Sequence, residues 1–235
     1  MLVAYVAVVV ASGLALLWTT GSGTPPPEAL PFLFWLLANL LGEVLWLPAP
    51  RGRGYLSMAT AANFAAIVVL PAPFAMAVTS LAQGLADILF RRRRWYQVLF
   101  NSGMCCVTVF AASMTFTRLG GVREGVEALL TPLNAIPLAT TAAVYFVVNT
   151  ALVAGAIAFQ RRQSAWSVWQ MGFGHAYQLL GSATLTLLGY FFAILFLTWG
   201  YMSAFLAAAA TYFVRDAYLR YVREVDRQGE GAALP

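Results

Sequence analysis

Long apolar runs, interrupted by proline, glycine and arginine, dominate this chain and constrain its fold more than any other feature. Of the 235 residues, 61% are hydrophobic and 10% are charged, whereas soluble domains contain about 45–50% apolar and about 25% charged residues. A membrane-spanning helix needs about 20 mostly apolar residues, so the chain can hold several. We therefore expect an all-α, polytopic integral membrane helical bundle with little sequence left for a soluble domain.

Proline and glycine divide the apolar runs into about eight transmembrane helices. Pro48 and Pro50 close the second run, and Pro71-Ala72-Pro73 makes a tight turn between the third and the fourth. The stretch 171–214 is too long for one span, and we expect it to break near Thr198-Trp199-Gly200. The expected spans are about 2–18, 29–47, 55–70, 74–90, 95–116, 136–159, 171–196 and 201–214.

Three segments of this map have a further interpretation. Spans 55–70 and 74–90 are short, and a re-entrant pair is the alternative to two full crossings; it leaves the side of both chain ends unchanged. Residues 122–130, in the polar stretch after the fifth span, favour a short interfacial helix. Residues 215–235 carry a mixture of charged and apolar side chains, and we expect them to form a cytoplasmic C-terminal tail.

The basic residues predict the orientation. All 14 are arginines, and cytoplasmic loops carry the excess of basic residues in membrane proteins. In an eight-span arrangement, twelve of the arginines fall in the tail and in loops on one side, and the other side holds only Arg118 and Arg123. We therefore expect a multi-pass protein of the cell (plasma) membrane with both termini in the cytoplasm.

The densest arginine groups lie directly at the ends of expected spans. They are Arg91, Arg92, Arg93 and Arg94 before the fifth span and Arg161 and Arg162 after the sixth. Four arginines beside a hydrophobic helix favour an anchor that sets topology and contacts anionic lipid. The lipid bilayer is therefore an expected partner, and nucleic acid is not.

Several catalytic classes lack the residues that they need. The chain has no lysine, which excludes Schiff-base sites for retinal or pyridoxal phosphate and the lysine of a phosphate-binding P-loop. His175 is the single histidine, so no histidine-rich metal site is expected. Cys105 and Cys106 are adjacent in an apolar run and are interpreted as buried thiols. We expect neither an enzyme nor a metal or other cofactor.

Polar side chains recur at helical spacing along six of the expected spans. Three ionisable residues, Glu43, Asp87 and His175, lie within apolar runs, and ionisable residues inside a bilayer are functional candidates by default. Neutral residues three or four positions apart continue the same faces. The candidate ligand-binding set is Glu43, Asp87, Asn101, Asn149, His175, Gln178, Gln83 and Asn39.

Two interpretations of these faces remain open. Lipid cannot satisfy polar groups, so the faces should point inward, and they then form either a polar cavity or hydrogen bonds between helices. Structural alternatives exist for the charged members as well. Asp87 lies four residues before Arg91 and is spaced to pair with it, Glu43 is within reach of Arg51 or Arg53, and His175 is suited to a hydrogen bond inside the bundle.

The middle of the chain resembles a known family. The stretch GEVLWLPAP from Gly42 to Pro50 and the stretch ADILFRRRRWYQVLFN from Ala86 to Asn101 are similar to the membrane-spanning sensor regions that precede HD-GYP and GGDEF signalling domains in bacteria. The stretch YFVVNT from Tyr145 to Thr150 resembles a later helix of these regions. The resemblance implies sensing, identifies no ligand, and departs from the family because no catalytic domain follows in this sequence.

These observations favour a sensor or signal-transduction module that binds a small molecule or lipid in a polar intramembrane cavity. The alternatives are the substrate-binding or membrane subunit of a small-molecule, vitamin-type transporter, and a non-catalytic structural membrane subunit. A cytoplasmic or membrane protein is an expected partner, through the C-terminal tail or through the first helix. That helix carries Ala7, Ala11 and Ala15, which is the small-residue spacing of helix–helix contacts in membranes.

Overall fold

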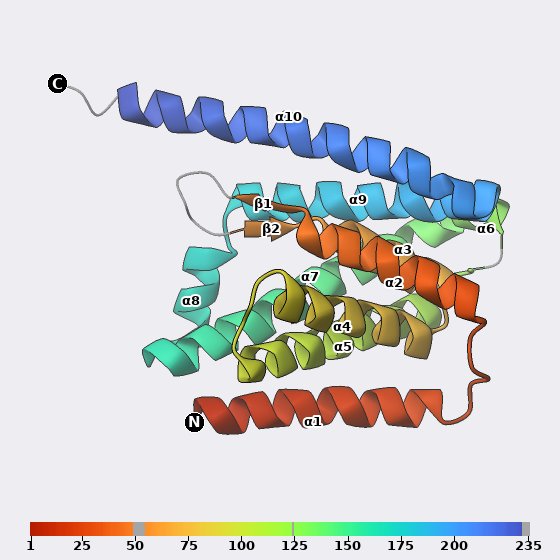
Figure 1. Cartoon of the computed structure of the whole chain (residues 1–235), viewed down its shortest axis with the longest axis horizontal. Helices are drawn as coiled ribbons and strands as arrows, with labels where there is room; N and C mark the ends of the chain where they lie inside the picture. The colour runs from red at the N-terminus through yellow and green to blue at the C-terminus, as the bar shows by residue number, and fades with distance from the viewer. Residues whose placement is uncertain (49–54, 124, 232–235) are drawn as a thin grey trace.

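The chain folds into a bundle of helices with one short two-stranded ribbon (Figure 1). The computed structural model describes residues 1–48, 55–123 and 125–231. The elements in chain order are α1 (Leu2–Gly21), α2 (Ala29–Val44), β1 (Trp46–Pro48), β2 (Tyr55–Ser57), α3 (Ala59–Val69), α4 (Ala72–Leu89), α5 (Trp95–Arg118), α6 (Val126–Leu130), η2 (Pro132–Asn134), α7 (Ala135–Arg161), α8 (Ala165–Gly172), α9 (Ala176–Trp199), η3 (Gly200–Met202) and α10 (Ser203–Gly231).

Among the described residues, five helical segments are long and apolar enough to cross a membrane. They are Leu2–Gly21, Ala72–Leu89, Trp95–Arg118, Pro132–Arg161 and Ala176–Val225. The last of these segments contains both α9 and α10, which are separated by a turn at Gly200, where φ is +56°. The helices α2 and α3 are also apolar but shorter, at 16 and 11 residues. Length and composition therefore identify a helical membrane protein.

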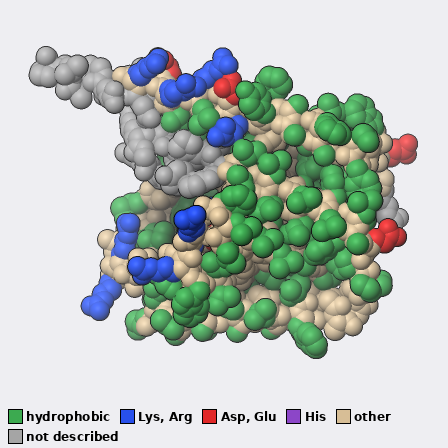
Figure 2. Space-filling view, in the orientation of Figure 1, with side chains coloured by type: hydrophobic (Ala, Val, Ile, Leu, Met, Phe, Trp, Pro, Cys, Tyr) green, Lys and Arg blue, Asp and Glu red, His purple; other side chains and the backbone are tan. Residues whose placement is uncertain are grey.

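The surface of the bundle is apolar and its interior contains polar side chains, the reverse of a soluble domain. On α2, Asn39 and Glu43 are buried, while Leu33 and Leu37 are 51% and 61% exposed. The same division holds on α4, where Asp87 is buried and Ile88 is exposed. Figure 2 shows hydrophobic side chains over most of the visible face, with basic side chains gathered at one end. This distribution is expected of helices that face lipid.

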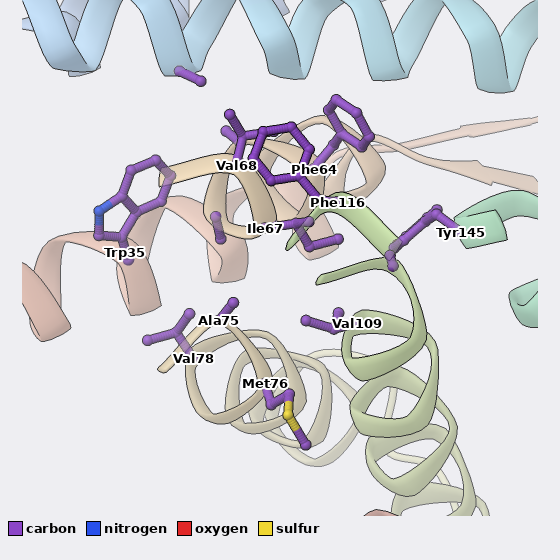
Figure 3. Packing of buried hydrophobic residues seen from close by; sticks show 14 of the residues in the cluster. Trp35, Phe64, Ile67, Val68, Ala75, Met76, Val78, Val109, Phe116 and Tyr145 are labelled. Atoms are coloured by element: carbon purple, nitrogen blue, oxygen red, sulfur yellow. The ribbon is translucent and has the colours of Figure 1, made fainter. Parts of the chain in front are cut away.

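The core lies where α2, α3, α4, α5 and α9 converge (Figure 3). Trp35 is fully buried on α2, and its ring lies 5.4 Å from that of Phe192 and 4.9 Å from that of Phe196, both on α9. Phe64 and Phe116 are also almost fully buried. The most extensive helix contacts join α4 to α5, α1 to α5, α3 to α9 and α5 to α7. Nine of the 11 residues of the short helix α3 are buried, and it contacts α2, α4, α5 and α9.

Two close approaches of helix backbones depend on glycine. A Cβ atom at Gly13 on α1 would lie 3.0 Å from the carbonyl oxygen of Gly103 on α5. A Cβ atom at Gly189 on α9 would overlap the backbone of Ala61 on α3. Small residues allow such contacts in membrane bundles, where van der Waals packing drives helix association.

The structure departs from the expected spans in three places. The segment 55–70 contains only an 11-residue helix, because residues 55–57 pair with 46–48 as an antiparallel ribbon with Leu47 opposite Leu56. Residues 163–175, expected to be mostly loop, contain the extra helix α8. The tail expected from residue 215 continues α10 without a break, and Asp216 pairs with Arg220 one turn later at 2.6 Å. Arg51 and Arg53 lie outside the described residues.

Most of the segments that carry arginines lie at one end of the bundle. The turn between α4 and α5, the end of α7 and the end of α10 lie at the left of Figure 1, together with the ribbon, α8 and the start of α1. At the opposite end, α6 lies close to the turn between α9 and α10. The arginine groups 91–94 and 161–162 therefore belong to the same end of the molecule.

Candidate ligand-binding cavity

Four charged side chains meet where α2, α4 and the α4–α5 turn come together. Arg91 Nη2 lies 2.7 Å from Glu43 Oε2, and Arg91 Nη1 lies 3.0 Å from Asp87 Oδ1. Arg93 Nε lies 3.2 Å from the same Asp87 oxygen, and the side-chain amide of Asn101 donates a hydrogen bond to Asp87 Oδ2. Glu43 is 3% exposed and Asp87 is fully buried. Because buried charges are costly unless they are paired, this ion-pair network holds the carboxylates in place.

The sequence of the α4–α5 turn explains how the arginines reach this position. Arg91 follows Asp87 by four residues, so its side chain returns to the same face of α4. The backbone N–H of Arg93 donates to the carbonyl of Asp87 at 2.9 Å, and Arg92 adopts φ +48° to reverse the chain. Burial lowers the pKa of the Arg91 guanidinium, but the carboxylates of Glu43 and Asp87 raise it more, and its pKa lies above the ordinary arginine value. Arg91 therefore stays charged.

A second set of polar contacts connects the ribbon with α3 and α7. The hydroxyl of Ser57 donates to Glu43 Oε2 at 3.4 Å and accepts the backbone N–H of Ala59, the first residue of α3, at 3.2 Å. One turn further along α3, the amide of Asn63 donates to the hydroxyl of Tyr145 at 2.8 Å. The first turns of α3 are thus joined both to the ion-pair network and to α7.

Two adjoining cavities open between these groups. The larger, of about 660 Å³, lies between α7, α8 and the start of α9, and the smaller, of about 320 Å³, borders the ion-pair network. Their walls share six residues, namely Ser57, Thr60, Arg93, Tyr145, Asn149 and Val153. Pockets that hold small molecules have about 300–1,000 Å³. We treat the two as one site and call it the polar cavity.

The structure brings most of the predicted ligand-binding residues to the polar cavity. Glu43, Gln83 and Asn101 line the smaller part, Gln178 lines the larger part, and Asn149 lines both. Asp87 lies behind this wall, where Arg91, Arg93 and Asn101 cover its carboxylate. The pairing of Asp87 with Arg91 that the spacing indicated is present, whereas Glu43 pairs with Arg91.

Besides Asp87, two further predicted residues are not among those that line the polar cavity. Asn39 is fully buried in the core and its amide donates to the carbonyl of Trp35 at 2.7 Å. His175 was expected inside a span, but it is the N-cap residue of α9, where its Nε2 lies 2.9 Å from the carbonyl of Met171. The reason is the chain break between α8 and α9, which continuous hydrophobicity over 171–196 did not reveal.

Other residues of the cavity wall were assigned differently or not at all from the sequence. Arg93 and Arg161 were expected to be anchors, yet both line the polar cavity. Val168, Met171 and Phe173 come from α8 and the residue after it; Val168 was expected in a loop, and the other two at the start of the span 171–196. A signal was available: a serine before an apolar run with tryptophans three residues apart is typical of a short amphipathic helix.

The chemistry of the polar cavity is that of recognition by arginine, amide and hydroxyl groups. Within the described residues, no three His, Cys, Asp or Glu side chains gather in a way that suits a metal ion. Cys105 lines the smaller part of the cavity and is a free, buried thiol.

Comparisons of this chain with protein-family models, with curated proteins and with solved structures give no match. The resemblance to bacterial sensor regions therefore stays a prediction. Some of the residues that carry it lie together. Glu43, Asp87, Arg91, Arg93 and Asn101 form one ion-pair network.

Proposed function

We propose that this chain is a multi-pass membrane module of the sensor or signal-transduction type, which binds a small molecule in the polar cavity and passes a displacement to α10. One observation carries the proposal. Ser57 and Thr60 line the cavity, and Met58 between them belongs to a buried cluster that includes Val214 and Tyr218 of α10. A change in the first turn of α3 therefore has a direct mechanical path to α10.

The ion-pair network suits a sensor because it connects the cavity to several elements at once. Arg91 also donates to the backbone carbonyl of Glu43 at 2.7 Å, so the end of α2, the end of α4 and the turn before α5 are joined through one guanidinium. Interfaces of this kind tend to have discrete arrangements rather than a continuous range. A ligand that contacts Arg93 would bias the arrangement through Asp87.

Native mass spectrometry of the full chain purified in mild detergent tests binding. We expect the wild-type protein to retain a small molecule, and Asn149→Leu to retain much less of it, because Asn149 lines both parts of the cavity. Gln160→Leu is the matched control, since Gln160 is exposed on the same helix. A spectrum without any small molecule, or one that all three proteins share, would contradict the proposal.

The proposal includes the orientation inferred from the arginines: about eight crossings, a location in the plasma membrane, and both termini in the cytoplasm. The gathering of the ribbon, the α4–α5 turn and the ends of α1 and α10 at one end of the bundle supports it (Figure 1). Inside-out vesicles provide the test. A C-terminal tag should be cleaved by added protease, and protection of the tag would exclude this orientation.

A transport subunit is the second candidate, and the outer face of α1 favours it. Ala7, Ala11 and Ala15 are all exposed, so the small-residue face is free to pack against a helix of a partner subunit. If this function holds, Ala11→Leu should abolish copurification of a membrane partner while leaving ligand retention unchanged. Copurification that survives Ala11→Leu would remove the reason for this candidate.

A further inference from the structure

The charges around the polar cavity are unbalanced in favour of cations. Two arginines, Arg93 and Arg161, line its larger part, and that wall contains no acidic residue among those the structure describes. In the smaller part, the carboxylate of Glu43 is already paired with Arg91. A bound molecule therefore meets guanidinium groups whose charge is not fully matched by the wall.

The geometry of Arg93 leaves its hydrogen-bonding edge available. Its Nε atom lies 3.2 Å from Asp87, which fixes the direction of the guanidinium. Its two terminal nitrogens have no partner within the described part of the chain, and the side chain is 43% exposed. A guanidinium with two parallel N–H donors is well suited to bidentate contact with a carboxylate or phosphate.

Buried amides in the same wall also lack partners. Gln83 and Gln178 are 9% and 6% exposed, and neither side chain has a hydrogen bond to another described residue. Asn149, which is half-buried and lines both parts of the cavity, has none either. Buried polar groups are normally hydrogen-bonded. These amides therefore mark positions where a bound molecule or water supplies the missing partner.

The larger part of the cavity also has apolar lining residues. Val153 and Ile157 of α7, Val168 of α8 and Phe173 line it, and Ile157 and Phe173 pack against the cluster that contains Val168. A ligand that fills this space needs an apolar portion, because apolar surface gains most when it leaves water. The cavity thus combines an arginine end, an amide middle and an apolar wall.

We infer that the polar cavity takes an amphiphilic oxyanion, a molecule whose carboxylate or phosphate lies against Arg93 and Arg161 and whose short apolar part lies against α7 and α8. This inference rests on the proposed function and names the class of ligand. A free alkyl phosphate or carboxylate and the headgroup region of an anionic lipid share this chemistry. The experiment below separates the two sources.

The test measures calorimetric binding of hexyl phosphate to the full chain in nanodiscs of neutral phosphatidylcholine, with hexanol as the uncharged counterpart. We expect hexyl phosphate to bind and hexanol to bind at least tenfold more weakly. Arg161→Gln should weaken the binding of hexyl phosphate by roughly tenfold to a hundredfold, as the loss of a charge-assisted hydrogen bond predicts. The control is Arg118→Gln, because Arg118 is exposed at the opposite end of α5. This variant should bind hexyl phosphate with unchanged affinity.

Repeating the titration in nanodiscs that contain phosphatidylglycerol identifies the source. Weaker apparent binding there supports the anionic lipid as the occupant, because the lipid competes, and unchanged binding supports a free molecule. Gln178→Met provides a second variant that removes an amide without removing charge, and it should also weaken binding.

Three results would overturn the inference. Equal affinity for hexyl phosphate and hexanol, or equal loss in Arg161→Gln and Arg118→Gln, would show that the arginines do not select an oxyanion. Binding of hexyltrimethylammonium in place of hexyl phosphate would overturn the ligand class and leave the sensor proposal standing. If no probe binds and native mass spectra also show no retained molecule, both proposals fail together.

Discussion

Arg91 contacts three acceptor groups at the ion-pair network. Its guanidinium contacts the carboxylates of Glu43 and Asp87 and the backbone carbonyl of Glu43. Both carboxylates are buried, and the cost of a buried charge is met only while its partner remains. Removing Arg91 alone should therefore lower the stability of the protein more than removing Arg91 together with its carboxylate partners.

Replacing Arg91 with methionine should therefore destabilise the protein by about 3–5 kcal/mol, the range for breaking a buried ion pair from one side. The combined variant Glu43→Gln with Arg91→Met should be more stable than Arg91→Met alone, because it removes one of the orphaned carboxylates. Thermal unfolding in detergent micelles measures both. Arg118→Met, at an exposed position, is the control, and an equal loss there would contradict the assigned role of Arg91.

The amides of the cavity wall show what residue patterns can and cannot predict. Helical spacing placed Gln83, Asn149 and Gln178 on inward faces, since lipid cannot satisfy them, and all three line the polar cavity. The same spacing does not distinguish a cavity from the core. Asn39 shares the face of Glu43 yet is buried in the core, because the side chains of α9 fill the space beside Trp35.

At the scale of elements, α3 connects most of what was described. It is short, it packs against α9 through glycine, and its first turn borders the cavity. Its boundaries were predicted only in part. Pro71 correctly ended the apolar run, but nothing local indicated that residues 55–57 would pair with 46–48 rather than begin the helix, since the pairing depends on contacts between two strands.

The contact between α3 and α9 should not tolerate a side chain at Gly189. A Cβ atom there overlaps the backbone of Ala61, which has no rotamer to change. We expect Gly189→Ala to lower stability by about 1–3 kcal/mol, as overpacked cores do. Gly172→Ala is the matched control, because a Cβ atom at that position meets nothing within 4 Å. If the two variants unfold at the same temperature, the result would argue against this helix contact.

Met58 joins α3 to α10 and should govern how firmly α10 is held. Its side chain is 2% exposed and packs in the cluster that contains Val214 and Tyr218. Met58→Ala should cost about 2–5 kcal/mol through the cavity that it leaves. Faster amide hydrogen exchange should follow in residues 214–222 of α10. Met202 is 65% exposed, so the control Met202→Ala should change neither stability nor hydrogen exchange. Unchanged exchange in Met58→Ala would contradict the proposed coupling between α3 and α10.

At the scale of the whole molecule, the distribution of polar and apolar side chains identifies the solvent. Leucines of α2 face outward while its asparagine and glutamate face inward, which is stable only where the surroundings are hydrocarbon. Composition alone was enough to predict this feature. Composition could not predict how the helices are arranged in space, because many arrangements bury the same polar faces. Contacts between segments that are distant in the sequence decide among these arrangements.

An outward position near the middle of α2 should therefore reject charge. Leu37 is 61% exposed, and arginine at the centre of a spanning helix costs about 2.5–3.5 kcal/mol on insertion scales. We expect Leu37→Arg to reduce the amount of protein recovered from membranes and to lower its stability in nanodiscs. The control Ser22→Arg lies in the exposed loop after α1. Equal recovery of both variants would mean that Leu37 faces water.

The continuity of α10 has a consequence for any signal that leaves the membrane. The helix runs from Ser203 to Gly231 over 29 residues, which at 1.5 Å per residue is about 43 Å, whereas the hydrocarbon core is about 30 Å thick. If α10 crosses the bilayer along its normal, as the proposed topology requires, about two turns of it would extend beyond the hydrocarbon core. Because α10 is continuous from Ser203 to Gly231, under the proposed function a tilt imposed at Tyr218 would change the angle at which the end of the helix is presented to a partner.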